Sequence, residues 1–321
     1  MAIKKIGVLT SGGDAPGMNA AIRGVVRAGF NHKVEIAGIF RGYSGLLNDE
    51  IKVLSHRSVS NIMDRGGTVL KTSRCPEFLT HEGQKRAVEI LHRNSIDAVV
   101  VIGGDGSYRG ALALSRDWKI PCVGLPGTID NDLNGTDRTI GSDTALETAL
   151  GAIDKIKDTV NSMERIFIVE VMGRNCGYLA LRAALAGGAE QVLIPEVKYE
   201  LSDVCQEITE GYIRGKASWI IILAEGAGNA VDLAEKISDL TDLETRVVVL
   251  GHIQRGGIPT AEDRILGGRL GAAAVDLLVK GESGKAIGVM CDKINMVPLD
   301  VACQPYKFDY SADLKLIKTL T

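Results

Sequence analysis

Short apolar runs alternate with helix-length segments along most of this 321-residue chain. Each run is rich in strand-forming residues and ends at glycine, proline or an acidic residue, a pattern typical of buried strands in a parallel sheet. Runs spaced by helical segments predict βα units. The sequence therefore predicts an α/β fold, with strands at residues 5–9, 34–40, 98–102, 121–125, 166–171, 191–194, 219–223 and 247–250.

Length and charge narrow the class of protein. A chain of 321 residues with 45% hydrophobic content is long enough for two domains with buried cores. Its 37 basic and 40 acidic residues leave a net charge of −3, so no overall field favours nucleic acid or an anionic membrane surface. We expect neither as a partner.

The start of the chain and the spacing of its cysteines indicate the cellular compartment. The first apolar run ends at Ser11, too soon for a signal-peptide core or a membrane span, so we expect a cytoplasmic protein. The six cysteines lie far apart with no Cys-x-x-Cys pair. This spacing argues against a zinc site or a disulfide framework and predicts reduced thiols.

The first glycine-rich segment, residues 10–17, follows the first strand and precedes a helical pattern over residues 17–30. Small residues there let backbone N–H groups approach an anion at a helix N-terminus, although tight turns also use glycine for steric reasons alone. The helix carries Arg23 and Arg27 one turn apart. They form either a solvated surface or an anion site.

Two further segments bring acids to strand ends. In residues 103–107, Asp105 suits a divalent cation between itself and a polyphosphate, or else it is the N-cap of the next helix. In residues 126–132, Asp130 and Asp132 point the same way if the backbone is extended. A metal ligand beside a general base explains this pair, and a solvated loop is the alternative.

Basic residues follow two later strands. Arg174 comes after residues 166–171, and His252 and Arg255 come after residues 247–250. Such side chains clamp phosphate by charge-assisted hydrogen bonds, although a single loop arginine is more often a surface charge. Anion loops, metal-suited acids and phosphate-suited cations converge at the strand ends, which favours phosphoryl transfer.

These segments, together with residues 9–19, 171–177 and 250–257, resemble the bacterial ATP-dependent 6-phosphofructokinases over nearly the whole chain. The resemblance implies two doubly wound, Rossmann-like, three-layer domains with the active site in the cleft between them. It places an ATP-binding domain at residues 1–140 plus 253–305 and a sugar-phosphate-binding domain at residues 141–252 plus 306–321. It also implies a homotetramer.

The resemblance implies a role for each matching residue. ATP contacts Gly13, Arg74, Cys75, Gly104, Asp105, Gly106 and Ser107, with Mg²⁺ at Asp105. Fructose 6-phosphate contacts Thr128, Ile129, Asp130, Met172, Gly173, Arg174, Glu225, His252, Ile253, Gln254 and Arg255, with Arg165 and Arg246 reaching in from a neighbouring subunit. The implied catalytic residues are Asp130 as base for the sugar 1-hydroxyl, and Thr128, Arg174, Asp132 and Arg74.

Two glycines bear on the phosphoryl donor. Gly106 and Gly127 leave room beside the inner phosphate of a nucleotide, where pyrophosphate-using relatives carry aspartate and lysine. The sequence thus favours ATP over pyrophosphate. A kinase of another acceptor and a non-catalytic sugar-phosphate sensor are further alternatives, but a sensor needs no base beside a hydroxyl.

The resemblance also implies an effector site for ADP and phosphoenolpyruvate. Its residues are Arg23, Gly24, Val25, Val26, Arg27, His56, Asn61, Lys157, Gly188, Ala189, Glu190, Arg214 and Lys216. This chain departs from well-regulated members at Lys157 and His56, where arginine occurs, and at Ala217 and Ser218, where lysine and histidine are usual. These losses predict weaker effector binding.

Overall fold

The computed structural model describes residues 3–163, 165–216, 218–306 and 309–321, and the chain divides into two compact units. Unit 1 comprises Met1–Thr144 and Arg255–Tyr306, and unit 2 comprises Ala145–Gln254 and Lys307–Thr321. The chain therefore passes from one unit to the other three times. Within the described ranges, none of the helices combines the length and the hydropathy that a membrane-spanning segment requires.

Unit 1 is built on a seven-stranded sheet in the order β11-β10-β5-β4-β1-β2-β3. Its inner strands are parallel and strongly buried, and β4 is buried at every residue, as the apolar runs predicted. The strands are β1 (Lys5–Thr10), β2 (Glu35–Ile39), β3 (Ile51–Val53), β4 (Ala98–Gly103), β5 (Cys122–Pro126), β10 (Lys285–Met290) and β11 (Lys293–Pro298).

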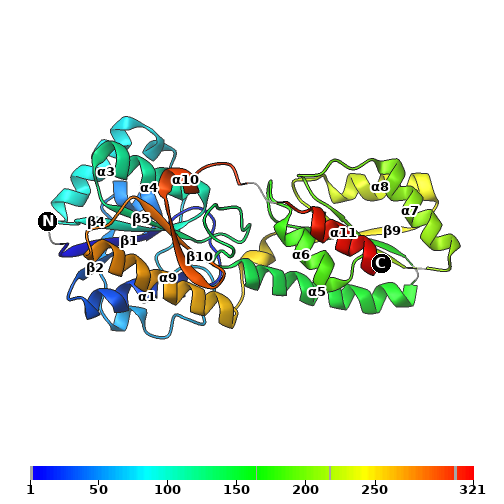
Figure 1. Ribbon diagram of the computed structural model, residues 1–321, viewed down its shortest axis with the longest axis horizontal. Helices are drawn as coiled ribbons and strands as arrows, with labels where there is room; N and C mark the ends of the chain where they lie inside the picture. The colour runs from blue at the N-terminus through cyan, green and yellow to red at the C-terminus, as the bar shows by residue number, and fades with distance from the viewer. Residues whose placement is uncertain (1–2, 164, 217, 307–308) are drawn as a thin grey trace. The chain divides into compact units, whose positions relative to one another are not determined.

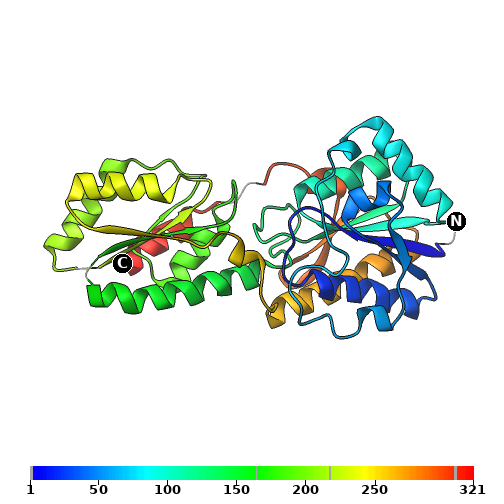
Figure 2. The same ribbon diagram turned by 180° about the vertical axis from the view of Figure 1, so that it is seen from behind.

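Helices cover both faces of this sheet (Figure 1). On one face α1 (Met18–Asn31) packs against α9 (Ala261–Val279) so closely that a Cβ at Gly24 would lie 2.7 Å from the Gly268 carbonyl oxygen. The reverse view shows the same pair together on that face (Figure 2). The opposite face carries α2 (Gly42–Leu47), α3 (His81–Arg93), α4 (Asp105–Trp118) and α10 (Leu299–Ala302), and short turns form η1 (Arg57–Val59) and η2 (Pro76–Leu79).

Unit 2 is a smaller three-layer unit around a parallel sheet in the order β7-β8-β6-β9. Neighbouring residues on β6 face opposite cores: Val169 lies among α5, α6 and α11, and Ile168 among α7 and α8. The strands are β6 (Ile166–Val171), β7 (Gln191–Leu193), β8 (Trp219–Ala224) and β9 (Thr245–Val249). The helices are α5 (Ser142–Met163), which begins in unit 1, α6 (Tyr178–Gly187), α7 (Leu201–Ile213), α8 (Ala230–Thr241), α11 (Ser311–Leu320) and the short η3 (Gly251–Arg255), which ends in unit 1.

The predicted α/β class with two three-layer units is confirmed, and each of the eight predicted strands occurs. The sequence missed three strands: β3, β10 and β11. β3 and β11 pair antiparallel at the two edges and are largely exposed, so they lack the apolar run that marks a buried strand.

A buried carboxylate holds the start of α5 within unit 1. Asp263, 1% exposed, accepts hydrogen bonds from Gly141 N at 2.7 Å and from the N and Oγ1 of Thr144 at 2.9 and 2.5 Å. Burial raises the pKa of Asp263, although these hydrogen bonds oppose that shift. The acid caps the helix that carries the chain towards unit 2.

Candidate active site

Three loops of unit 1 meet at one edge of its sheet. They follow β1, β4 and β5, which are neighbours in the order β5-β4-β1 and parallel, so their carboxyl ends lie together. Backbone hydrogen bonds join the loops: Ser11 N donates to Ile102 O at 3.0 Å, and Gly127 N donates to Gly103 O at 3.1 Å. The geometry brings the three predicted motifs side by side.

The loop after β1 is braced from two directions. Thr72 Oγ1 donates to Gly12 O at 2.7 Å, which ties this loop to the segment that leads into Arg74 and Cys75. The Arg255 guanidinium lies where a side chain at Gly13 would be, so only glycine leaves that space to the arginine. Gly13 and Arg255, predicted to contact different substrates, are therefore neighbours.

The loop after β4 leads directly into α4. Gly104 is the N-cap, and Asp105 is the first residue of the helix, so the alternative reading of Asp105 as the N-cap is wrong. The half-exposed Asp105 carboxylate accepts a hydrogen bond from Arg109 at 2.9 Å, which raises the pKa of that guanidinium. A Cβ at Gly106 would meet no atom within 4 Å, so space is open beside this helix start.

The loop after β5 buries its first acid. Asp130 is 5% exposed, and its backbone N donates to Thr128 Oγ1 at 3.2 Å. The Thr128 carbonyl accepts from Thr139 Oγ1 at 2.6 Å, and the Thr128 side chain lies against Gly104 of the neighbouring loop. The base candidate thus stands on a segment that contacts the loop carrying Asp105.

The condition for aligning the two acids of this loop is not met. An extended backbone between Asp130 and Asp132 would point both carboxylates the same way. Asn131 instead has φ of 51°, in the left-handed region, which breaks the two-residue alternation. The relation between the two carboxylates is therefore set by a turn.

The other residues predicted to contact fructose 6-phosphate within one subunit lie at the carboxyl ends of β6, β8 and β9 in unit 2. Glu225 Oε1 accepts from Gly173 N at 3.2 Å and from Arg174 N at 2.8 Å, while the fully buried Gln254 accepts from Met172 N at 2.8 Å. Two side chains from later in the chain thus hold the turn of Arg174, whose φ is 51°. His252 and Ile253 are exposed in η3.

Arg165 and Arg246 lie at the amino-terminal ends of β6 and β9, whereas Arg174 follows the carboxyl end of β6. Arg165 comes before the first residue of β6, while Met172 follows its last. Both arginines pair with Glu244, Arg165 at 2.6 Å. A six-residue strand spans roughly 20 Å, so the two arginines do not share a site with Arg174 of the same unit.

The predicted effector residues form two groups, one in each unit. In unit 1, Val25 and Val26 are fully buried, which leaves Arg23 and Arg27 as the half-exposed cations of α1. Arg27 contacts the His56 ring, which also packs on Phe30 with ring centroids 4.2 Å apart. Gly24 is used in the packing of α1 on α9, and Asn61 is exposed.

In unit 2 the acid of the second effector group already has partners. Glu190 accepts from Ile220 N at 2.6 Å and pairs with Lys216 at 3.0 Å, and the Lys216 ammonium lies 5.1 Å from the Trp219 ring centroid. Lys157 lies against Gly188, Ala189 is buried, and Arg214 pairs with Glu210 at 3.9 Å. Ala217 lies outside the described residues.

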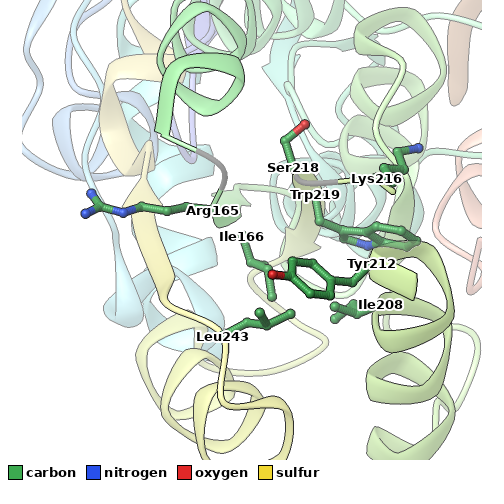
Figure 3. Close-up of a pocket in the computed structure, with 8 residues that line it drawn as sticks. All are labelled: Arg165, Ile166, Ile208, Tyr212, Lys216, Ser218, Trp219 and Leu243. Atoms are coloured by element: carbon green, nitrogen blue, oxygen red, sulfur yellow. The ribbon is translucent and has the colours of Figure 1, made fainter. Parts of the chain in front are cut away.

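A pocket beside this group is too small for a nucleotide. Its volume of about 20 Å³ holds one or two water molecules. Figure 3 shows Tyr212 and Trp219 on one side and the Arg165 side chain pointing away from both rings. Arg165 and Lys216, predicted for different ligands, both border it.

Sequence reasoning missed several residues that hold the loops. Thr72, Thr139 and Glu244 act through a hydrogen bond or an ion pair, and Tyr43 OH donates to Ser107 O at 2.8 Å from the core. Thr72 and Tyr43 lie far along the chain from their partners, as Glu244 does from Arg165. No local pattern marks such a residue.

Comparison with known proteins assigns the chain to a family. The phosphofructokinase family matches residues 5–278. The chain belongs to this family. Curated relatives described as ATP-dependent 6-phosphofructokinase include those of Bacillus velezensis, at 56% identity over 292 residues, and Bacillus subtilis, at 54% over 292 residues, each alignment covering 91% of both chains.

Solved phosphofructokinases share the fold. The Saccharomyces cerevisiae structure superposes with a TM-score of 0.85 at 37% identity, covering 98% of this chain and 46% of that one, so this family member spans less than half the yeast chain. A pyrophosphate-dependent phosphofructokinase from Nitrosospira multiformis has a TM-score of 0.85 at 23% identity over 96% of this chain and 86% of that chain. The fold therefore leaves the choice of donor to individual residues.

Proposed function

We propose that this chain transfers the γ-phosphoryl group of ATP to the 1-hydroxyl of fructose 6-phosphate, the glycolytic step that yields fructose 1,6-bisphosphate and ADP. The observation that carries the proposal is the buried Asp130, on a loop packed against the glycine-rich start of α4. A base next to a polyphosphate-binding loop suits transfer to an alcohol. The family relatives carry the same activity in their names.

Asp130 is the general base of this proposal. It accepts the proton of the sugar 1-hydroxyl as that oxygen attacks the γ-phosphorus in line. Arg74, Thr128 and Arg174 donate to the transferring group and offset its charge, and Asp132 is a second acid at the phosphoryl centre. Gly13, Cys75, Gly104 and Ser107 hold the nucleotide, and the residues of unit 2 at the ends of β6, β8 and β9 hold the sugar phosphate.

The residues around Asp105 fit Mg²⁺. The described residues contain no group of three or more His, Cys, Asp or Glu side chains arranged to hold a metal. Mg²⁺ commonly takes one or two carboxylates and completes its shell with phosphate oxygens and water, so a half-exposed Asp105 beside open space is sufficient. When bound, Mg²⁺ would neutralise phosphate charge, and Asp105 would hold it with Oδ1, since Arg109 donates to Oδ2.

The donor assignment depends on Gly106. Open space at this position accommodates the inner phosphate of a nucleotide. Gly127 is a weaker argument because a Cβ there would lie 2.9 Å from Met18 Cε and 3.0 Å from Ile102 Cγ2, so packing alone favours glycine. Gly106 supports ATP over pyrophosphate.

An assay of both donors tests the function. Purified protein, fructose 6-phosphate and Mg²⁺ are mixed with ATP or pyrophosphate, and fructose 1,6-bisphosphate is followed by coupled enzymes. We expect turnover with ATP and at least about 100-fold less with pyrophosphate, corresponding to about 2.7 kcal/mol. Turnover with pyrophosphate alone would reverse the donor, and binding of the sugar phosphate without turnover would favour a sensor.

Effector control by ADP and phosphoenolpyruvate is part of the proposal, in a weakened form. Lysine at 157 provides a point charge where a planar guanidinium makes paired hydrogen bonds to phosphate. An incoming anion also competes with Glu190 for Lys216. Both effects lower the affinity for an effector phosphate.

Restoring the arginine is expected to strengthen inhibition. Lys157→Arg should lower the phosphoenolpyruvate concentration for half inhibition about tenfold, equivalent to ~1.4 kcal/mol from one charge-assisted hydrogen bond. Initial rates against phosphoenolpyruvate measure this, with Lys155→Arg on the same helix as the matched control. Strong inhibition of the unmodified enzyme, unchanged in Lys157→Arg, would contradict the weakened site.

A homotetramer is also proposed. The number of subunits follows from the family resemblance. The positions of Arg165 and Arg246, at the strand ends opposite Arg174, are compatible with contacts to the ligand of a neighbouring subunit. Sedimentation equilibrium measures the assembly. A monomer at assay concentrations would remove these two arginines from the substrate site.

A further inference from the structure

The loop that carries Asp130 contains a residue in an unusual conformation. Asn131 has φ of 51° and is 2% exposed, so it forms a buried left-handed turn immediately after Asp130. Among side chains with a Cβ, asparagine and aspartate tolerate this region best. The direction in which the chain leaves Asp130 therefore depends on the residue at 131.

The Asn131 side chain adds a second restraint. Its Nδ2 donates to the Asp137 carbonyl oxygen at 3.1 Å, across the loop. Asp137 is itself fixed: its N donates to Val289 O at 2.7 Å, and its Oδ2 accepts from Cys291 N at 2.7 Å. Val289 and Cys291 lie at the tight β10–β11 hairpin. A chain of hydrogen bonds thus connects Asn131 to the rigid sheet.

The far end of the loop is closed as well. Ile140 N donates to Pro126 O at 2.8 Å, so the segment from 127 to 140 starts and finishes at the end of β5. Thr128 holds the backbone N of Asp130 from the preceding side. Asn131 holds the other side, and Asp130 stands between two anchored neighbours.

The Asn131 amide carries an energetic cost as well as a hydrogen bond. Asn131 Oδ1 is buried and finds no hydrogen-bond partner among the residues that the structure describes. A buried acceptor without a bond is unfavourable, and glycine would satisfy the positive φ without it. What the side chain contributes beyond its conformation is the donor to Asp137.

We propose that Asn131 is a positioning residue for the base: its left-handed turn and its amide tether to Asp137 together fix the direction of the Asp130 carboxylate. This rests on the proposed function of Asp130. Because the tether acts on the base and on neither substrate directly, its loss lowers kcat and leaves both KM values nearly unchanged.

Asn131→Gly tests the tether because it keeps the positive φ and removes the amide. We expect kcat to fall about 10- to 100-fold, with both KM values within about twofold, because small misplacements of a reacting group are costly. Asn131→Asp is the second variant, since aspartate accepts the same φ and has no donor for Asp137; it is expected to lose at least as much. Asn134→Ala is the control: it removes an amide-to-carbonyl bond of the same kind, to Gln304 O at 2.7 Å.

A double mutant distinguishes a loss of Asp130 positioning from a general loss of order in the loop. In the Asp130→Ser background, Asn131→Gly is expected to cause less than about a twofold further loss, because the group it positions is gone. An equal loss in both backgrounds, or a kcat of Asn131→Gly close to that of the unmodified enzyme, overturns the inference. Failure of the unmodified enzyme to phosphorylate fructose 6-phosphate removes the proposed function and this inference together, whereas the other two outcomes leave the function standing.

Discussion

Replacing Asp130 with serine is expected to lower kcat by about 10²–10⁴, the loss typical of removing a general base. Serine cannot accept the 1-hydroxyl proton near neutral pH, while it keeps a small polar side chain in a nearly buried position. The affinity for fructose 6-phosphate should change by less than about tenfold, because the base acts mainly in the transition state. Steady-state kinetics with a direct binding titration measure both quantities.

A matched control for this variant is Asp117→Ser. Asp117 lies near the end of α4 and pairs with Arg116 on the surface, so its removal deletes an aspartate from the same unit without touching the loops after β1, β4 and β5. Activity of the control should equal that of the unmodified enzyme. If Asp130→Ser also turned over near the normal rate, the base would have to be assigned elsewhere.

Gly106→Asp is expected to lower kcat/KM for ATP by about 10²–10³, equivalent to roughly 2.7–4 kcal/mol from a carboxylate facing the nucleotide phosphates. The fold should tolerate the change, because a Cβ at 106 meets no atom within 4 Å and an acid in the first turn of α4 is favourable with the helix dipole. Thermal unfolding and initial rates at varied ATP measure the two effects separately.

Gly106→Ala distinguishes charge from bulk at this position. A methyl group fits the open space and carries no charge, so kcat/KM for ATP should fall by no more than about tenfold. Full ATP turnover in the Gly106→Asp variant would remove the nucleotide's inner phosphate from this position. Gain of pyrophosphate turnover in the same variant would also support the assignment, because it would show that the residue at 106 selects between the two donors.

The sequence was sufficient for the parts of the fold that local patterns encode. Eight strands were predicted because apolar β-rich runs between turn residues have few other stable outcomes, and α1 was predicted from its helical spacing. Of these eight strands, β9 lies at an edge of its sheet and contains no buried residue. β3 and β11 were missed because they gain their stability from a partner strand and carry no apolar run of their own, whereas β10 is an inner, mostly buried strand that was missed although its residues are largely apolar. Their pairing is a tertiary property.

The same division applies to the site. The glycine-rich loops and their acids were visible because their residue types suit phosphate and metal chemistry. The placement of Arg255 in the space beside Gly13, and the bond from Thr72 to the Gly12 carbonyl, join segments that lie far apart in the chain, and no local pattern specifies them. The roles assigned to individual residues remain predictions until the variants are measured.

By itself, the sequence determined that this chain is an α/β protein with phosphate-suited loops at its strand ends, because periodicity and residue chemistry are local properties. Only the tertiary structure decided that Asn131 turns the chain between the two aspartates, that Asp137 and the β10–β11 hairpin hold this turn, and that Arg165 and Arg246 lie at the strand ends opposite Arg174. The physical reason is that hydrogen bonds and strand order depend on which distant segments meet, and many sequences with the same local pattern would bring different segments together.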